Sequence, residues 1–384
     1  MATPRSYAIY YVTYLFLIPG FYLYQYAIYV GFDPFLRGYL VASSGISLTV
    51  FFTYYILDLS RQSSQYTIDW LFWASTIFFA IWAAYFSQYD LSDVASDSYM
   101  YASLPWSSYF LLGRTAPQER RSFRYITSIS HYIMIAVVVL NTSSGYFNLG
   151  VTDITATYQA FALIFVVNFY FVISLSQNRA LTAINILVGG ATILVVGSRS
   201  EIVYIMSYVL FYVISSRYKL ISFVAFAVVG IALSVSQTVL ELFPRNRFYD
   251  LYETGAEGNR LARDYANTAA MRSIWEHPFV GDYANYEPGF YAHNIFSVWV
   301  DFGLAGFVLY GLCILVPAYL LIHDFRIGAR STQNAFAIAN ILACIVLLLT
   351  SKNGAYYAVP FAIGIAAYQH SRNLRSVPMR AAVA

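Results

Sequence analysis

The chain has 384 residues, of which 59% are hydrophobic, 19% aromatic and only 11% charged. Soluble domains carry about 25% charged residues, so this composition excludes an ordinary soluble enzyme, predicts a membrane protein and leaves no reason to expect a nucleic-acid partner. The net charge of +3 says little by itself, because topology depends on where the charges lie.

Apolar runs of roughly 16–24 residues, each long enough to cross a bilayer, follow one another along the chain. We therefore expect an all-α polytopic integral membrane protein with about twelve spans in a single membrane domain, residues 1–384. The first run has no small-residue cleavage site, so it is expected to remain as a span. The run 99–112 is the weakest because it contains Pro105, and a re-entrant or tilted element is the alternative. The expected spans are 7–30, 37–58, 67–87, 99–112, 124–142, 155–175, 180–197, 200–215, 219–240, 294–322, 333–350 and 354–369.

The charges between these runs predict the orientation. The side that holds both termini would collect 14 of the 22 basic residues and four of the 19 acidic residues, a balance of +10, against −7 on the other side. Cytoplasmic loops are enriched in Lys and Arg, so both termini are expected in the cytoplasm. The 37 tyrosines are typical of aromatic belts at the two interfaces, although Tyr and Trp also stack on sugar rings.

One long loop, residues 241–292, would lie on the outer side. It holds five arginines among eight acids, and loops of this length are usually functional or disordered. The stretch "NRLARDYANTAAMRSIWEHP" has helical periodicity, which predicts a helix from about Gly258 to Glu276 that is stopped by Pro278. Arg260 and Arg263 fall on one face of it, and Arg272 falls near Leu261 and Tyr265 on the apolar face. Surface ion pairing with neighbouring acids is the alternative for all three arginines.

The motif "VVGSRSEIVY" lies between two spans on the same outer side. Gly197 is expected to end one helix, and Ser198 with Glu201 forms an S-x-x-E capping box for the next. Arg199 is then a cation at a helix N-terminus, where the helix dipole favours anions. A helix N-terminus together with an arginine is suited to binding phosphate.

The stretch "YAHNIFSVWVDFGLAGF", beginning at Tyr291, places His293 and Asn294 where the chain re-enters the membrane. An interfacial histidine bonded to the backbone is one reading. Ionisable groups at this depth are also functional candidates. Gly303 and Gly306 would allow close helix packing.

The GSR element, the arginine-bearing loop helix that ends in "HPFVGDY", and "HN" followed by "FGLAGF" appear in this order between Leu194 and Leu321. In this the chain resembles the O-antigen polymerase and O-antigen ligase superfamily (Wzy and WaaL). The resemblance implies an active site of Arg199, Arg263 and His293, with Arg260 and Arg272 as rivals for the loop arginine. The chain departs from the family at "PFVGDY", where the family has P-x-G-x-G, and lacks the Trp that usually follows the loop arginine.

The resemblance implies a membrane glycosyltransferase that polymerises polyprenyl-pyrophosphate-linked repeat units at the outer leaflet of the bacterial inner membrane. Its partners would be an undecaprenyl-pyrophosphate-linked glycan donor and acceptor, the bilayer and a regulator of chain length. Arginines can compensate the pyrophosphate charge without a metal or cofactor, and an imidazole suits a general base at neutral pH. His293 is the expected base, Ser198, Glu201 and Asn294 the supporting residues, and the alternative bases are Glu201, Asp264, Asp282 and Glu287.

Three other readings stay open. A ligase, which moves the finished chain to lipid A core in lipopolysaccharide synthesis, would use the same donor chemistry. A lipid-linked sugar transporter or flippase would more often carry ionisable groups near mid-membrane and repeated halves. A metal-dependent glycosyltransferase would use carboxylates, for which the outer-loop acids Asp90, Asp93 and Asp97 are candidates.

Overall fold

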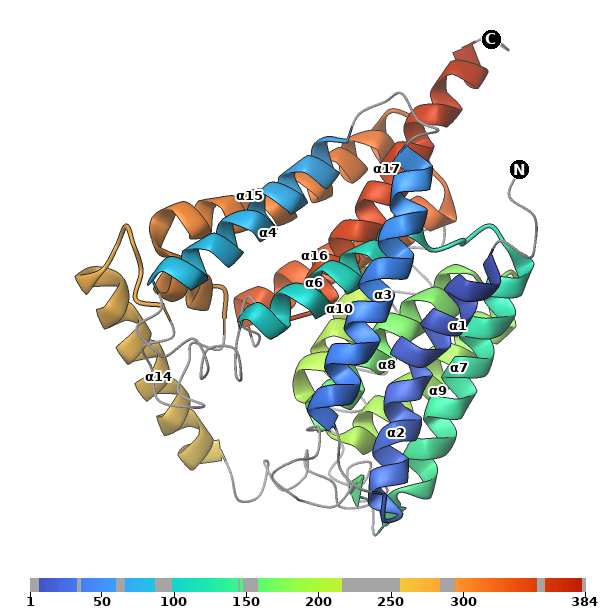
Figure 1. Cartoon of the computed structure of the whole chain (residues 1–384). Coiled ribbons are helices and arrows are strands. Elements are labelled where there is room, and N and C mark those ends of the chain that lie inside the picture. The colour runs from blue at the N-terminus through green and yellow to red at the C-terminus, as the bar shows by residue number, and fades with distance from the viewer. Residues whose placement is uncertain are drawn as a thin grey trace. The chain divides into compact units, whose positions relative to one another are not determined.

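The structure is a computed structural model, drawn in Figure 1. In the described part of the chain, the regular elements are α-helices and one short hairpin. The helices divide into two units: unit 1 holds residues 1–50 and 117–255, and unit 2 holds residues 51–116 and 256–384. Each unit is described by itself, and the single-domain organisation remains a prediction. The structure describes residues 7–32, 36–59, 66–86, 99–143, 146–147, 158–215, 256–283, 294–350 and 356–381.

Unit 1 is organised around a helix that is buried on all sides. Residues 161–174 of this helix, α8, are all buried, which explains why its sequence is apolar on every face. Its Asn168 is satisfied inside the unit, because it accepts from the Tyr14 hydroxyl and its Nδ2 donates to Thr127 O at 3.2 Å. The elements of unit 1 are α1 (Ala8–Leu17), α2 (Pro19–Tyr29), the first part of α3 (Leu36–Leu59), α7 (Arg121–Leu140), β1 (Thr142–Ser143), antiparallel β2 (Tyr146–Phe147), α8 (Tyr158–Ser174), α9 (Arg179–Val196) and α10 (Arg199–Ser215).

Unit 2 is held together by a close helix crossing. A Cβ on Gly364 of α17 would lie 2.1 Å from Phe110 O of α6, so the two backbones meet where only glycine fits. Small residues at a crossing are typical of helix packing in membranes. The elements of unit 2 are the end of α3, α4 (Thr67–Phe86), α6 (Tyr99–Thr115), α14 (Ala256–Glu276), α15 (Phe296–Arg326), α16 (Thr332–Thr350) and α17 (Ala358–Ala381).

Five of the described helices are long and apolar enough to cross a membrane: Val41–Leu59, Thr67–Tyr85, Arg121–Leu140, Phe296–Arg326 and Thr332–Thr350. Four shorter apolar helices are Ala8–Leu17, Tyr158–Ser174, Ala180–Val196 and Ser200–Tyr212. The predicted helical class is confirmed for the described residues, and several of these helices have the length and composition that a membrane span needs. The full set of twelve spans remains a prediction, and the expected span 219–240 lies outside the described residues.

Two expected spans are interrupted. The run 7–30 is two helices, because Pro19 has no amide hydrogen to continue α1 and instead begins α2. The run 294–322 is broken at Gly303, whose φ of 63° and ψ of −170° are not helical. The doubtful run 99–112 is a 17-residue helix with Pro105 inside it.

Candidate functional site

The GSR element has the helix–turn–helix geometry that its sequence predicts. Gly197 adopts the left-handed conformation with φ 76°, and its N–H donates to Ile193 O and Leu194 O, which ends α9. The next helix, α10, begins at Arg199, so this residue lies at a helix N-terminus in unit 1. The Arg199 side chain lies outside what the structure describes.

The residues that flank Arg199 are occupied with each other. Ser198 and Glu201 are both completely buried, and the Ser198 hydroxyl donates to the Glu201 carboxylate. The Ser200 hydroxyl donates to the same carboxylate oxygen at 2.9 Å. A capping box predicts bonds from these side chains to backbone N–H groups, whereas the contact that the structure shows joins the two side chains. A carboxylate that is buried and bonded in this way is a poor general base for a substrate.

The loop helix is α14, which spans Ala256–Glu276 and agrees with the predicted range of 258–276. Its described buried face consists of Ala266, Ala270 and Ile274, of which Ala270 and Ile274 pack with Val300 and Trp299 of α15. The backbones of Arg260 and Arg263 lie in this helix, while their side chains lie outside what is described. Their roles in binding remain predictions.

The sequence-based placement of Arg272 on the apolar face is wrong. Tyr265, which was expected to mark that face, is 64% exposed, and the Arg272 side chain is 79% exposed. The Arg272 Nε donates to Glu276 Oε1 at 2.8 Å, and this bond lowers the pKa of the Glu276 carboxyl. The buried face of α14 is the one that meets α15, and it contains Ala270. At 3.6 residues per turn, Ala270 lies about 160° around the helix from Arg272. Surface ion pairing is thus the observed state of Arg272.

The segment that follows α14 is fastened to the break in α15 by main-chain bonds. Leu304 N–H donates to Pro278 O at 2.9 Å, and Asp282 N–H donates to Val300 O at 2.6 Å. Two indoles add to this, since Trp299 Nε1 donates to Pro278 O at 2.9 Å and Trp82 Nε1 of α4 donates to Val280 O at 3.0 Å. The backbone groups freed by the broken helix thus find partners in the loop, as the membrane environment requires.

Gly303 is required at this junction for two reasons. Its positive φ is unfavourable for other residues, and a Cβ there would lie 2.0 Å from Phe279 O. The sequence suggested that this glycine permits close packing between helices. In the structure it instead breaks α15 and lets the backbone of residue 279 approach the break. We call residues 278–282 together with Gly303 the α14–α15 junction.

The start of α15 is also capped and anchored. Asn294 Oδ1 accepts from Phe296 N–H at 2.9 Å, and Ile295 N–H donates to Leu348 O of α16 at 2.7 Å. Asn294 therefore supports the helix start. His293, the residue before it, lies outside the described residues, as do Glu287 and the acids at 90, 93 and 97.

The predicted site residues fall in both units. Arg199, Ser198 and Glu201 belong to unit 1, whereas α14 with its arginines and the stretch that leads into α15 belong to unit 2. Their convergence on one substrate remains a prediction. Of the alternative bases in unit 2, Asp264 is exposed, and Asp282 is half-buried in the α14–α15 junction.

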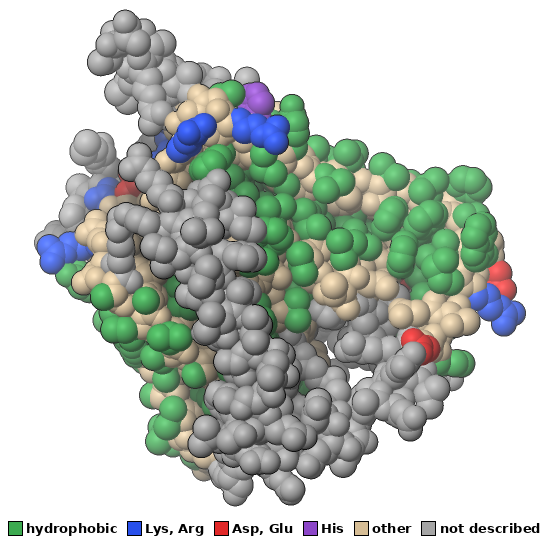
Figure 2. Space-filling model, turned by 180° about the vertical axis from the view of Figure 1, so that it is seen from behind, with side chains coloured by type: hydrophobic (Ala, Val, Ile, Leu, Met, Phe, Trp, Pro, Cys, Tyr) green, Lys and Arg blue, Asp and Glu red, His purple; other side chains and the backbone are tan. Residues whose placement is uncertain are grey.

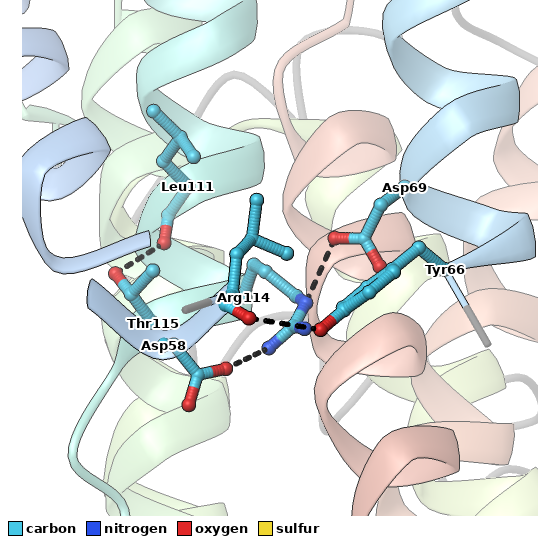
Figure 3. Close-up of polar contacts among 7 residues, drawn as sticks. Asp58, Tyr66, Asp69, Leu111, Arg114 and Thr115 are labelled. Carbon is cyan, nitrogen blue, oxygen red and sulfur yellow. Dashed lines mark hydrogen bonds and ion pairs between the residues drawn. The ribbon is translucent and has the colours of Figure 1, made fainter. Parts of the chain in front are cut away.

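A buried ion cluster that the sequence analysis did not find joins three helix ends in unit 2 (Figure 3). The Arg114 side chain at the end of α6 is 1% exposed, and its Nε donates to Asp69 Oδ1 of α4 at 2.8 Å. Its Nη1 donates to Asp58 Oδ2 of α3 at 3.1 Å, and its guanidinium lies 5.7 Å from the ring centroid of Tyr55. The Asp69 side chain is 3% exposed and that of Asp58 is 36% exposed, so the cluster is buried at Arg114 and Asp69 and partly exposed at Asp58.

A second buried network lies where α15 ends, α16 begins and α17 passes. Asp324 Oδ2 is 2.8 Å from His370 Nδ1 and accepts from Asn373 Nδ2 at 2.9 Å. Asn334 of α16 joins the network because its Oδ1 accepts from Asn373 Nδ2 at 3.4 Å, and its own Nδ2 donates to Ala329 O at 3.0 Å. These partners satisfy a carboxylate that would otherwise be costly to bury, so both polar networks tie helix ends together.

Among the residues that the structure describes, no group of three or more His, Cys, Asp or Glu side chains could hold a metal ion. In comparisons with known proteins, no family model and no curated protein matches this sequence.

Proposed function

We propose that the chain is a membrane glycosyltransferase that polymerises polyprenyl-pyrophosphate-linked oligosaccharide repeat units into a surface polysaccharide. In this proposal twelve spans cross the bacterial inner membrane, both termini are cytoplasmic, and residues 241–292 form a periplasmic loop. The proposal rests on the resemblance to the O-antigen polymerase and ligase superfamily.

One structural observation supports this proposal most directly. The α14–α15 junction fastens the arginine-bearing loop helix to the helix that follows His293 and Asn294. A polymerase needs a cation for the leaving pyrophosphate and a base for the acceptor hydroxyl on one rigid support, because misplacement of either by about 1 Å costs about 100-fold in rate. The loop helix and the helix that follows the base candidate in the chain are joined in this way in unit 2.

In the proposed reaction, Arg199 and Arg263 bind the donor pyrophosphate, with Arg260 as the rival for the second position. Guanidinium groups match phosphate oxygens in bidentate geometry and stay charged as the glycosidic bond breaks. His293 removes the proton from the acceptor hydroxyl, whose oxygen then attacks the anomeric carbon with inversion. Arg272 is left out of this assignment because it is paired with Glu276 at the surface.

The experiment is a glycan ladder. The gene is deleted in its host and restored as wild type, Arg199→Ala, Arg263→Ala or His293→Ala at matched membrane abundance, with Arg272→Ala as the control on the same helix. Surface and lipid-linked glycans are then resolved by size. Polymerisation predicts single repeat units in the first three variants and a normal ladder in the control. A normal ladder in the His293 and Arg199 variants would refute the assignment.

The same experiment separates the alternatives. A ligase predicts full-length polymer that accumulates on the polyprenyl carrier. A transporter or flippase predicts loss of all surface glycan, with repeat units retained on the cytoplasmic side. In unit 2 the described buried residues Arg114, Asp69, Asp301 and Asp324 lie in the first two turns or the last turn of α4, α6 and α15. In unit 1, His131 is buried midway along α7. A transport pathway is expected to place ionisable groups near mid-membrane, so the position of the unit 2 charges supports the enzyme and His131 is the residue to test for the transporter.

A further inference from the structure

The apolar part of α15 ends at the α14–α15 junction. From Leu304 to Ile322 the helix contains no Asp, Glu, Lys or Arg, and His323, Asp324 and Arg326 follow directly. Nineteen residues at a rise of 1.5 Å cover about 28 Å, close to the ~30 Å thickness of the hydrocarbon core. If the charged end marks one face of that core, Gly303 and Leu304 lie at the other.

One side of α15 is exposed from Leu304 to Tyr319. Exposed apolar side chains recur at spacings of three and four residues, which places them on one helical face. In a membrane-spanning helix, this face meets lipid. We call it the α15 lipid stripe, and its members with their exposed fractions are Leu304 (36%), Val308 (50%), Leu312 (44%), Leu315 (59%) and Tyr319 (66%).

The apolar surface continues past Leu304 onto the loop segment and α14. Phe279 is 71% exposed and Val280 43% exposed, and both belong to the segment that is bonded to Leu304. On α14 itself, Trp275 is 78% exposed and Met271, one helical turn earlier, is 42% exposed. Figure 2 shows hydrophobic side chains gathered over the face of unit 2 that carries α15, with charged side chains at its ends.

The exposed side of α14 is divided between an apolar and a polar stripe. Met271 and Trp275 are spaced by four residues, and the neighbouring row consists of Thr268, Arg272 and Glu276 at the same spacing. Arg272 and Glu276 are paired with each other, so the polar row is suited to the headgroup and water side. This end of α14 therefore offers lipid an apolar row, Met271 and Trp275, beside a row that can face headgroups and water.

Tryptophan side chains also indicate that the α14–α15 junction lies at the membrane–water boundary. Trp82 and Trp299 both turn their indole N–H groups to carbonyls of residues 278–280. Trp is enriched at the membrane–water boundary, where the ring is in an apolar layer and the N–H has a polar partner. Together with Trp275, three tryptophans lie in or beside the segment that the length of α15 places at this boundary.

We propose that Met271, Trp275, Phe279 and Val280 insert into the lipid interface at the Phe296 end of α15, so that α14 lies on the bilayer as an interfacial helix. The ligand is the boundary between lipid headgroups and acyl chains, continuous with the α15 lipid stripe. This holds whether or not the chain is a polymerase, because it depends only on α15 crossing the membrane.

The test uses the full-length protein in nanodiscs of phosphatidylethanolamine and phosphatidylglycerol. A nitroxide is attached to Trp275→Cys or Met271→Cys, to Thr268→Cys in the polar row, and to Leu312→Cys in the α15 lipid stripe. Cys313 and Cys344 are buried, and labelled wild type gives the blank. The accessibility of each label to oxygen, which concentrates in lipid, is compared with that to a water-soluble nickel chelate.

The labels at 271 and 275 are expected to have an oxygen-to-nickel ratio several times that at 268 and approaching that at 312. Equal ratios at 275 and 268 would overturn the proposal, because both rows would then face water. Low access to both reagents at 275 would also overturn it and would indicate a covering protein surface. If that protection is lost when the protein is diluted with lipid, the cover is a second copy of this chain.

Discussion

The ion cluster of Arg114 allows a sharp test of how unit 2 is stabilised. Asp69→Asn keeps the shape of the side chain but removes the charge that faces a guanidinium with 1% exposure. Breaking a buried pair by removing one partner costs about 3–5 kcal/mol, because the other charge remains buried. Asp58 is 3.1 Å from the same guanidinium but is 36% exposed, so Asp58→Asn is expected to cost about 1 kcal/mol or less.

For each variant, the free energy of unfolding is measured in mixed micelles by titration with SDS. Arg114→Met should cost as much as Asp69→Asn, since it leaves the Asp69 carboxylate buried. The double variant Arg114→Met with Asp69→Leu removes both charges and should recover most of the loss, because apolar replacement of a whole buried pair is often neutral. Equal costs for Asp58→Asn and Asp69→Asn, or additive losses in the double variant, would refute the reasoning.

Three further outcomes follow from described contacts. Gly303→Val should speed hydrogen exchange at the amides of Leu304 and Asp282, because its side chain meets Phe279 O, whereas Gly311→Ala, with open space around it, should leave exchange unchanged. Arg272→Ala should leave thermal stability unchanged, and a loss of stability would mean that the pair with Glu276 is more than a surface contact. In an NMR titration the same variant should raise the pKa of Glu276 toward its ordinary value. Asp324→Asn should cost about 1–3 kcal/mol, because its buried partners His370 and Asn373 lose their shared acceptor, and a neutral result in the same SDS titration would contradict this role.

Local signals in the sequence identified the helices well. Hydrophobic run length placed α3, α4, α7 and α16 within a few residues of their observed bounds, and Gly197 marked the end of α9. The loop helix α14 was predicted from periodicity and Pro278 to within two residues. These features depend on a residue and its near neighbours, so one sequence suffices to find them.

Tertiary partners were not predictable in the same way. Asp58, Asp69 and Arg114 are three of the charges counted above on the side expected to be cytoplasmic, and nothing in their spacing indicates that they meet. At the break in α15, the carbonyl of Phe279 from a separate segment approaches Gly303. A single glycine in an apolar run does not indicate that another segment contacts it. The placement of Arg272 on the apolar face was wrong for the same reason, because packing against α15 determines which face of α14 is buried.

The crossing of α6 with α17 has a consequence for how the protein is made. The glycines that meet there, Gly113 and Gly364, are separated by about 250 residues, and at about 5–20 residues per second the ribosome needs roughly 10–50 s to cover that distance. Throughout this interval α6 is already synthesised while its partner is not, and the α6 backbone at Gly113 must be covered by lipid or by a membrane chaperone. Residues 117–255 of unit 1 are synthesised in the meantime, so unit 1 is available to fold before the last helix of unit 2 exists.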